Sequence, residues 1–267
     1  MKRDAVLSIG FFMQNVTLKR EVVIPEINQP RLKVGFKHAH RILADRAKTS
    51  ECLLLISVGQ EAHEGKPFEL TIKLIDASFS KCTVLLGDSI QRYTMALASD
   101  SEPESYYQAA LKAGDDWLQR NSSALSKLTL PCKLVRWDDW LFHPNFSNTK
   151  ETIMVALEED EQYRKAFMET VDSYLNRYKR QRTFIAHFDW QRSSRICLNY
   201  LIEECAIFCL WPELKCEFEI YPNAHNLAIE ATRRKFLVPT FPGLLRSVNL
   251  RFRHANLFGP LQFASLQ

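Results

Sequence analysis

The chain has 267 residues, of which 46% are hydrophobic and 25% charged, and its formal net charge is +4. This is the composition of an ordinary globular protein with ample material for a core. No apolar run reaches the roughly 18 residues of a membrane-spanning helix, so a membrane protein is excluded.

Cysteine usage and the N-terminal sequence predict a cytoplasmic protein. The seven cysteines are scattered and odd in number, and none forms a CxxC pair or a Cys–His zinc framework. Buried reduced thiols explain them best, so we expect no disulfides and no metal. The short apolar stretch from Ala5 to Met13 lacks a convincing cleavage site, and a secretory signal is not predicted.

Positive charge is concentrated at the two ends of the sequence. Residues 1–48 carry ten Lys and Arg against four Asp and Glu, and residues 231–267 carry six basic residues and no acid. Basic ends on an acidic middle suggest a polyanionic partner. Solubility and helix-end charges would explain the same pattern, so composition alone leaves both readings open.

The first fifty residues give weak signals, with a strand near Val22–Ile24 and a helix from Val34 to Ala47. From residue 51 the pattern is clear. Buried strands are predicted at Cys52–Val58, Cys82–Leu86, Cys132–Arg136 and Lys215–Ile220, with a short strand or connector at Phe184–Phe188. Helices are predicted at Phe68–Phe79, Glu104–Leu125, Glu158–Arg182 and Ser193–Cys209. Alternating strands and helices indicate an α/β fold with a parallel sheet.

We expect a single domain over residues 1–267, in which residues 1–48 form a basic N-terminal extension without an assigned role. Parallel sheets bind ligands at the carboxyl ends of their strands. Ser57, Asp88 and Tyr221 all lie at or just beyond predicted strand ends. The topology is therefore expected to bring them toward one edge of the sheet.

Ser57 is the first candidate nucleophile. At a strand end its hydroxyl can be exposed next to backbone donors, and Gly59 would let a ligand approach the backbone. A lone serine in such a place more often only caps a turn. Leu55 stands where a GxSxG motif needs glycine, so an α/β-hydrolase elbow is not predicted.

The sequence contains a rival serine and an incomplete phosphate loop. Gly87-Asp88-Ser89-Ile90 resembles the block of GDS-type esterases, which makes Ser89 a candidate, but the DxxH that those enzymes carry late in the chain is missing. The segment from Gly59 to Lys66 is one residue too long for a phosphate loop, and Pro67 replaces the required Ser or Thr. ATP binding is therefore not predicted.

Tyr200 and Glu204 lie one helical turn apart in an apolar helix. A phenol and a carboxylate so placed can bind an α-ammonium, and an acid among apolar residues needs a partner or a function. The alternative is a surface Glu beside an interfacial Tyr. Glu203 points about 100° away and is a separate question. Tyr221 can carry protons through its hydroxyl, although Pro222 behind it also simply ends a strand.

Together these segments resemble the tRNA-dependent cyclodipeptide synthases over about Leu53 to Asn226. The resemblance rests on the order and spacing of five short blocks. They are Leu55-Ile56-Ser57-Val58-Gly59-Gln60 with His63-Glu64-Gly65, then Asp88-Ser89-Ile90-Gln91-Arg92, Arg136-Trp137-Asp138-Asp139, Tyr200-Leu201-Ile202-Glu203-Glu204 and Tyr221-Pro222. Gln60 and Tyr221-Pro222 are similar to the branch of the family in which a proline follows the second tyrosine.

The resemblance implies a Rossmann-like fold, similar to the catalytic domains of class I aminoacyl-tRNA synthetases, and an aminoacyltransferase without a cofactor. It implies that two aminoacyl-tRNAs yield a diketopiperazine in a ping-pong reaction, through an aminoacyl-enzyme and then a dipeptidyl-enzyme on Ser57. Tyr200 and Glu204 would bind the α-ammonium of the first group. Tyr221 would assist proton movement in the later steps.

The resemblance also implies contacts for the side chain and the tRNA. Leu53, Leu55, Leu85 and Ile207 would line a pocket for an apolar first amino acid, with Gly59 and Gln60 beside the nucleophile. The family binds tRNA through a basic helix that here corresponds to Glu104–Leu125. This sequence has few basic residues there, so others are expected to share the contact. The candidates are Lys112, Arg120, Lys127, Arg180 in the Arg177–Arg182 cluster, Arg233 and Arg234.

We therefore expect a cytoplasmic, monomeric enzyme whose partners are two aminoacyl-tRNAs, with no DNA or membrane partner. Two alternatives stay open. One is a GDS-type serine esterase that uses Ser89. The other is a non-catalytic tRNA-binding protein with a synthetase-like fold.

Overall fold

The computed structural model describes residues 31–37, 47–181 and 188–255, and the structural statements below concern these residues. Residues Leu32–Ala255 form one compact unit, and a second unit, Met1–Arg31 with Asn256–Gln267, lies almost wholly outside the described residues. The predicted strand Val22–Ile24 and most of the predicted connector Phe184–Phe188 also fall outside them.

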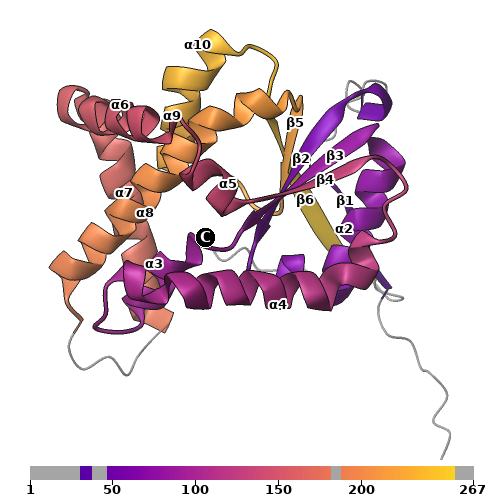
Figure 1. The fold of residues 1–267 in the computed structure, drawn as a ribbon, viewed down its shortest axis with the longest axis horizontal. Helices are drawn as coiled ribbons and strands as arrows, with labels where there is room; N and C mark the ends of the chain where they lie inside the picture. Colours follow the sequence, from indigo (N-terminus) through magenta and orange to yellow (C-terminus); the bar gives the residue numbers. More distant parts are fainter. Residues whose placement is uncertain (1–30, 38–46, 182–187, 256–267) are drawn as a thin grey trace, which may run out of the picture. The chain divides into compact units, whose positions relative to one another are not determined.

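A six-stranded sheet, in the order β1-β6-β5-β2-β3-β4, forms the centre of the described unit (Figure 1). Its strands are β1 (Arg31–Phe36), β2 (Glu51–Ser57), β3 (Lys81–Gly87), β4 (Cys132–Arg136), β5 (Phe218–Tyr221) and β6 (Arg246–Ala255). The pairs from β6 to β4 are all parallel. The predicted α/β fold with a parallel sheet is confirmed for these five strands.

Two strands were not predicted because they are not continuous apolar runs. In β1 the apolar residues alternate with Lys33 and Gly35, and Val34 and Phe36 pack on one core cluster. The predicted helix Val34–Ala47 is therefore wrong at its start, while residues 38–46 lie outside the described part. In β6 the buried Val248 and Leu250 alternate with polar residues, which is typical of a strand that is buried on one face.

Helices cover the sheet between its strands. The main ones are α2 (Gly65–Ser78), α3 (Gln91–Leu97), α4 (Tyr107–Leu125), α5 (Trp137–Leu141), α6 (Phe146–Glu159), α7 (Glu161–Gln181), α8 (Trp190–Leu210) and α9 (Leu227–Thr232). After α9 come the π-helical turn η5 (Arg233–Leu237) and the short α10 (Val238–Thr240). Short 3₁₀ turns complete the chain at η1 (Ala47–Thr49), η2 (Glu61–His63), η3 (Pro103–Tyr106) and η4 (Trp211–Leu214). Among the described helices, none combines the length and the apolar character needed to cross a membrane.

The predicted helix Glu158–Arg182 begins three residues late because the chain bends at Asp160. Asp160 ends α6 with an extended backbone, and its carboxylate then accepts a hydrogen bond from the Tyr163 N–H at 3.0 Å. One acid thus terminates a helix and satisfies the first turn of the next. The helix α6 was not predicted.

Strand alternation sorts the core into two layers. Leu53 and Leu55 of β2 face a cluster that includes α7 and α8, whereas Leu54 and Ile56 face the cluster with α2 and α4. Side chains two residues apart share a face. Ser57 therefore continues the row of Leu53 and Leu55 toward α8.

The order of the strands reverses between β2 and β5. From β2 the chain adds β3 and then β4 on one side, and it later returns to place β5 and β6 on the other. In open α/β sheets the crevice at such a switch point is where ligands bind. The residues that end β2 and β5 are Ser57 and Tyr221.

Candidate active site

Ser57 and Tyr221 meet at the switch point. Leu54 of β2 pairs with Ile220 of β5, so the last residues of the two parallel strands emerge side by side. The Ser57 Oγ lies 3.1 Å from the Tyr221 Oη. Gln60 donates a hydrogen bond from Nε2 to the same phenol oxygen at 3.0 Å. The predicted nucleophile and the predicted proton carrier are therefore in direct contact.

The turn after Ser57 is fixed by a buried histidine. The Ser57 N–H donates to the His63 Nδ1 at 2.9 Å, and the Trp117 indole N–H donates to the His63 carbonyl at 2.9 Å. Burial lowers the pKa of His63 to about 4, so the ring is neutral at physiological pH. Gly59 has a φ of 86°, which glycine adopts without strain. His63 thus positions the backbone of the nucleophile and is no base for its hydroxyl.

Tyr200 and Glu204 lie in α8 on the face turned toward Ser57. The Tyr200 hydroxyl donates to the Glu204 Oε1 at 3.0 Å. The Glu204 Oε2 is buried and makes no hydrogen bond of normal geometry with a described residue, although the Asn226 amide lies close enough to favour the charged carboxylate. Burial raises the pKa of Glu204 to about 7, against the opposing effects of the Tyr200 hydrogen bond and the nearby His225. An unpaired buried carboxylate oxygen is suited to a cationic ligand.

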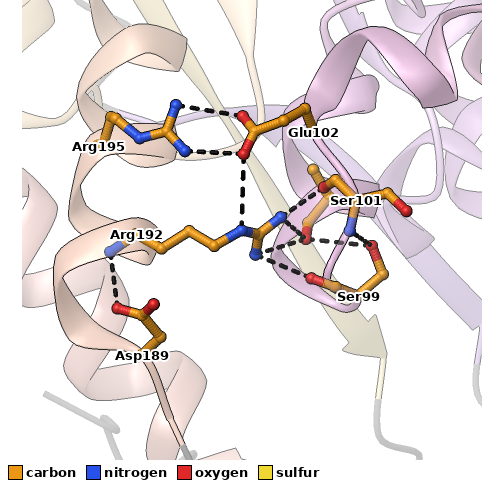
Figure 2. A network of polar contacts seen from close by, with 7 residues as sticks. Ser99, Ser101, Glu102, Asp189, Arg192 and Arg195 are labelled. Atoms are coloured by element: carbon orange, nitrogen blue, oxygen red, sulfur yellow. Dashed lines mark hydrogen bonds and ion pairs between the residues drawn. The ribbon is translucent and has the colours of Figure 1, made fainter.

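The first turn of α8 is anchored to the loop between α3 and η3. Figure 2 shows that Arg195 donates two hydrogen bonds to the Glu102 carboxylate, and that Arg192 donates to the carbonyls of Ser99 and Ser101. Asp189 caps the helix by accepting from the Arg192 N–H at 2.9 Å. These contacts fix the helix that carries Tyr200 and Glu204.

Glu203, the neighbour of Glu204, belongs to the core. It is 2% exposed, and its carboxylate accepts from the Tyr93 hydroxyl and the Trp137 indole at 3.0 Å each and forms an ion pair with Arg92. The Tyr93 ring in turn meets the Tyr200 ring edge to face, with centroids 6.0 Å apart. One buried acid therefore connects α3, α5 and α8 behind the site.

A second buried acid was missed by the sequence reasoning. Glu219 of β5 is fully buried, and its two oxygens lie 2.8 Å from the His225 Nε2 and 2.6 Å from the Arg233 Nη2. The His225 ring stacks on Tyr221 with an interplanar angle of 2°. The available signal was the alternation of Glu217 and Glu219 with apolar residues in the predicted buried strand, because an acid inside such a strand needs a partner.

Two cavities of about 410 and 490 Å³ open beside Ser57 and share part of their walls. Both are lined by Ser57, Gln60, Gln91, Arg177, Tyr200, Tyr221 and Asn226. The first cavity also contains Glu204 and His225 and is closed by the apolar side chains of Leu55, Leu85, Ile90, Trp137, Phe208 and Trp211. The second extends toward α3 and α7, past Tyr93, Thr94, Leu97, Tyr174, Cys197 and Leu201.

The cavities separate the predicted pocket residues into two groups. Leu55 and Leu85 line the first cavity, Gly59 lines the second, and Gln60 lines both. Leu53 and Ile207 are fully buried and line neither cavity, so these two predictions are corrected. Leu53 lies two residues further from the strand end than Leu55, on the same face, and so packs in the core beneath the cavity.

The rival serine is inaccessible. Ser89 is 0% exposed and lines neither cavity. The neighbouring Asp88 is paired with Arg136, whose Nε lies 2.6 Å from the carboxylate. The residues Gly87–Ile90 are thus buried and stabilise the fold.

The basic residues predicted to bind tRNA differ in their surroundings. Three are exposed but paired with acids: Lys112 with Asp116 at 2.8 Å, Arg120 with Glu64 at 2.8 Å and Lys127 with Glu69 at 3.8 Å. Arg180 and Arg234 are exposed. Arg233 is held by Glu219 and by the Leu245 carbonyl, so its predicted role on the surface is corrected.

In the described part of the chain, no three His, Cys, Asp or Glu side chains are grouped in a way that would bind a metal ion. The arrangement can perform acyl transfer with its own groups. It offers a hydroxyl nucleophile, a phenol in contact with it, and a buried carboxylate that lines the same cavity.

No family model and no curated protein matches the sequence, but solved structures do. A cyclodipeptide synthase from Fluoribacter dumoffii is 40% identical, with a TM-score of 0.80 over 84% of this chain and 99% of that one. A cyclodipeptide synthase from Candidatus Glomeribacter gigasporarum, solved with bound Phe-tRNAPhe, is 15% identical, with a TM-score of 0.66 over 87% and 98%. A protein from Mycobacterium tuberculosis, whose structure relates cyclodipeptide synthetases to type I tRNA synthetases, is 13% identical, with a TM-score of 0.55 over 88% and 99%. The last two similarities concern the fold alone.

Proposed function

Because this chain belongs to the cyclodipeptide synthase family, we propose that it joins the aminoacyl groups of two aminoacyl-tRNAs into a diketopiperazine, using Ser57 as the covalent carrier. One observation supports this above the others. The Ser57 hydroxyl lies in the wall shared by two cavities, 3.1 Å from the Tyr221 phenol. A single nucleophile can there serve two acyl groups in turn.

In the first step the Ser57 Oγ attacks the ester carbonyl of an aminoacyl-tRNA, and the 3′ or 2′ oxygen of the tRNA leaves. The serine proton passes to that oxygen, and an aminoacyl ester on Ser57 remains. Burial raises the pKa of Tyr221, against the effect of its hydrogen bond with Ser57, so the phenol stays protonated at neutral pH. It can accept the serine proton while giving its own. The ester is already activated, so ATP is not needed.

In the second step the amine of the Ser57-bound group attacks the ester of a second aminoacyl-tRNA. Attack in the opposite sense would free the serine and leave the dipeptide on tRNA, so a dipeptidyl-enzyme requires this direction. An ammonium has no lone pair and must first lose a proton. Glu204 both holds the ammonium and, with a pKa near 7, can take that proton.

In the last step the free amine of the dipeptide attacks its own ester on Ser57. The Ser57 Oγ leaves and regains a proton, and a cyclic dipeptide is released. The balance is two peptide bonds formed, two tRNAs released and an unchanged enzyme. All these groups come from one copy of the chain, so a monomer suffices.

The walls of the first cavity favour an apolar first amino acid. Leu55, Leu85 and Phe208 lie beside Glu204, which would hold the ammonium. A polar side chain packed against these three residues would lose its hydration without gaining a partner from them. The Candidatus Glomeribacter relative, solved with Phe-tRNAPhe, supports aminoacyl-tRNA as the kind of substrate.

The proposal is tested by mass spectrometry of the culture medium after bacterial expression. We expect the wild-type protein to release a cyclic dipeptide and Ser57→Ala to reduce it by at least about 100-fold, because the variant lacks the proposed nucleophile. Ser89→Ala is the control and should retain the product. Product that depends on Ser89, or tRNA binding without any product, would support one of the two alternatives.

A further inference from the structure

The second cavity contains one charged side chain. Arg177 of α7 lines it together with apolar and neutral polar residues, and no other residue in its lining carries a charge. The same arginine lines the first cavity. It therefore stands at the junction of the two, in the wall that also contains Ser57.

Arg177 differs from the other arginines around the site because no residue in the described part of the chain pairs with it. It makes no hydrogen bond or ion pair with a described residue, whereas Arg92 is paired with Glu203, and Arg136 with Asp88. Arg192 and Arg195 are likewise engaged by Glu102 and by backbone carbonyls (Figure 2). The Arg177 side chain is exposed and free to bind an anion.

The group that Arg177 binds must be common to both substrates, because it borders both cavities. In the proposed reaction the two amino-acid side chains occupy separate cavities, so neither is held in both. The 3′ end of the tRNA is shared by both, and the phosphate before the terminal nucleotide is one sugar away from the ester that Ser57 attacks. Arginine presents a planar fork of donors that matches a phosphate.

We propose that Arg177 binds the phosphate that joins the last two nucleotides of each aminoacyl-tRNA, at the junction of the cavities next to Ser57. This inference rests on the proposed function. The exposed Arg180 follows Arg177 at the i+3 position of α7, so it lies near the same helix face. It extends the positive charge away from the cavity mouth.

The test compares 3′-aminoacyl-adenosine with the aminoacyl ester of the dinucleotide cytidylyl-adenosine, which adds the phosphate and the cytidine before it; the loss of the preference in Arg177→Gln assigns it to the phosphate. The rate of Ser57 acylation is measured as kcat/KM. For the wild-type protein we expect the dinucleotide to react about 10- to 100-fold better, the range of one charge-assisted hydrogen bond. For Arg177→Gln this preference should fall to within about 2-fold, mainly through KM.

The matched control is Lys179→Gln, which removes one positive charge from an exposed position of the same helix turn. It should keep the wild-type preference for the dinucleotide. Thermal melting of both variants should match the wild type, since neither side chain is engaged in the core.

Three outcomes would overturn the proposal. In the first, Arg177→Gln reacts with both substrates at wild-type rates and so keeps the preference for the dinucleotide. In the second, Arg177→Gln slows both substrates equally, which would place Arg177 on the aminoacyl group. In the third, Arg177→Gln lowers kcat/KM only for aspartyl and glutamyl esters, which would mean that Arg177 selects acidic amino-acid side chains. If the wild-type protein acylates Ser57 with none of these esters nor with aminoacyl-tRNA, the proposed function itself fails.

Discussion

Glu203 and Glu204 are adjacent in α8 and differ in role because successive residues of a helix point about 100° apart. The Glu203 carboxylate is surrounded by the donors of Arg92, Tyr93 and Trp137. The Glu204 carboxylate has Tyr200 on one oxygen and no hydrogen bond of normal geometry with a described residue on the other. The first acid stabilises the fold, and the second is left in a state that suits a ligand.

At the residue scale we predict that Glu204→Gln stabilises the unliganded protein at pH 8. Burial raises the pKa of Glu204 to about 7 from its ordinary value of 4.5, so the folded state binds more protons than the unfolded state between these values. Wild-type stability therefore falls as the pH rises through this window. The variant avoids the buried charge, and its gain should be about 1–3 kcal/mol at pH 8.

The measurement is thermal melting of both proteins from pH 5 to pH 8. The difference in melting temperature should shrink as the pH falls toward 5, where Glu204 is protonated in the folded state. His225 faces the same cavity, and Glu219 raises its pKa against the opposing effect of burial. The series is therefore repeated in a His225→Gln background. A difference that does not change with pH would contradict the prediction.

Residue roles were predictable where a strand or helix pattern fixes the geometry. Ser57 and Tyr221 were expected to lie together because both end strands of a parallel sheet, and Tyr200 and Glu204 because they are one turn apart; the structure places all four in the lining of the first cavity, while their roles stay predictions. His225 follows β5 in an irregular segment, where no periodicity shows which way a side chain points. Its partner Glu219 was visible as an acid in a buried strand, but the sequence does not say what pairs with it.

At the scale of elements, the Glu203 cluster connects three helices behind the cavities. Glu203→Gln should destabilise the protein by about 3–5 kcal/mol, because it leaves the Arg92 guanidinium buried without a counter-charge. The double variant Arg92→Met with Glu203→Gln removes both charges, keeps an acceptor for the Tyr93 hydroxyl and the Trp137 indole, and should recover part of the loss.

The free energy of unfolding in urea measures both effects. At pH 8, Glu203→Gln is therefore expected to lower the free energy of unfolding, whereas Glu204→Gln is expected to raise it. A loss below about 1 kcal/mol for Glu203→Gln would mean that water, not Glu203, compensates Arg92.

Elements were predictable to the extent that burial was complete. The strands β2 and β3 are buried apolar runs, whereas β4 and β5 are short and contain charged residues; all four predictions were confirmed within three residues at each end. The half-buried β1 and β6 alternate and were missed. The break between α6 and α7 depends on a single capping acid, Asp160, within a charged stretch that otherwise suits a helix.

At the scale of the whole described unit, function follows from topology. The reversal of strand order between β2 and β5 opens a crevice, and α8 closes it from the side that Ser57 faces. The resulting cavities share the nucleophile, which is what a reaction with two acyl donors needs. The lysines and the arginine on and beside α4 are paired with acids. The cavity mouth, where Arg177 lies, is therefore a better place to seek tRNA contacts.

The central claim is that Ser57 carries the first aminoacyl group. Its most direct test is intact-protein mass spectrometry after mixing the protein with one aminoacyl-tRNA and quenching with acid within a single turnover. We predict a mass increase of one aminoacyl residue, located by peptide mapping on Ser57 and absent from Ser57→Ala. No adduct on the wild-type protein, or an adduct that persists in Ser57→Ala, would contradict the account.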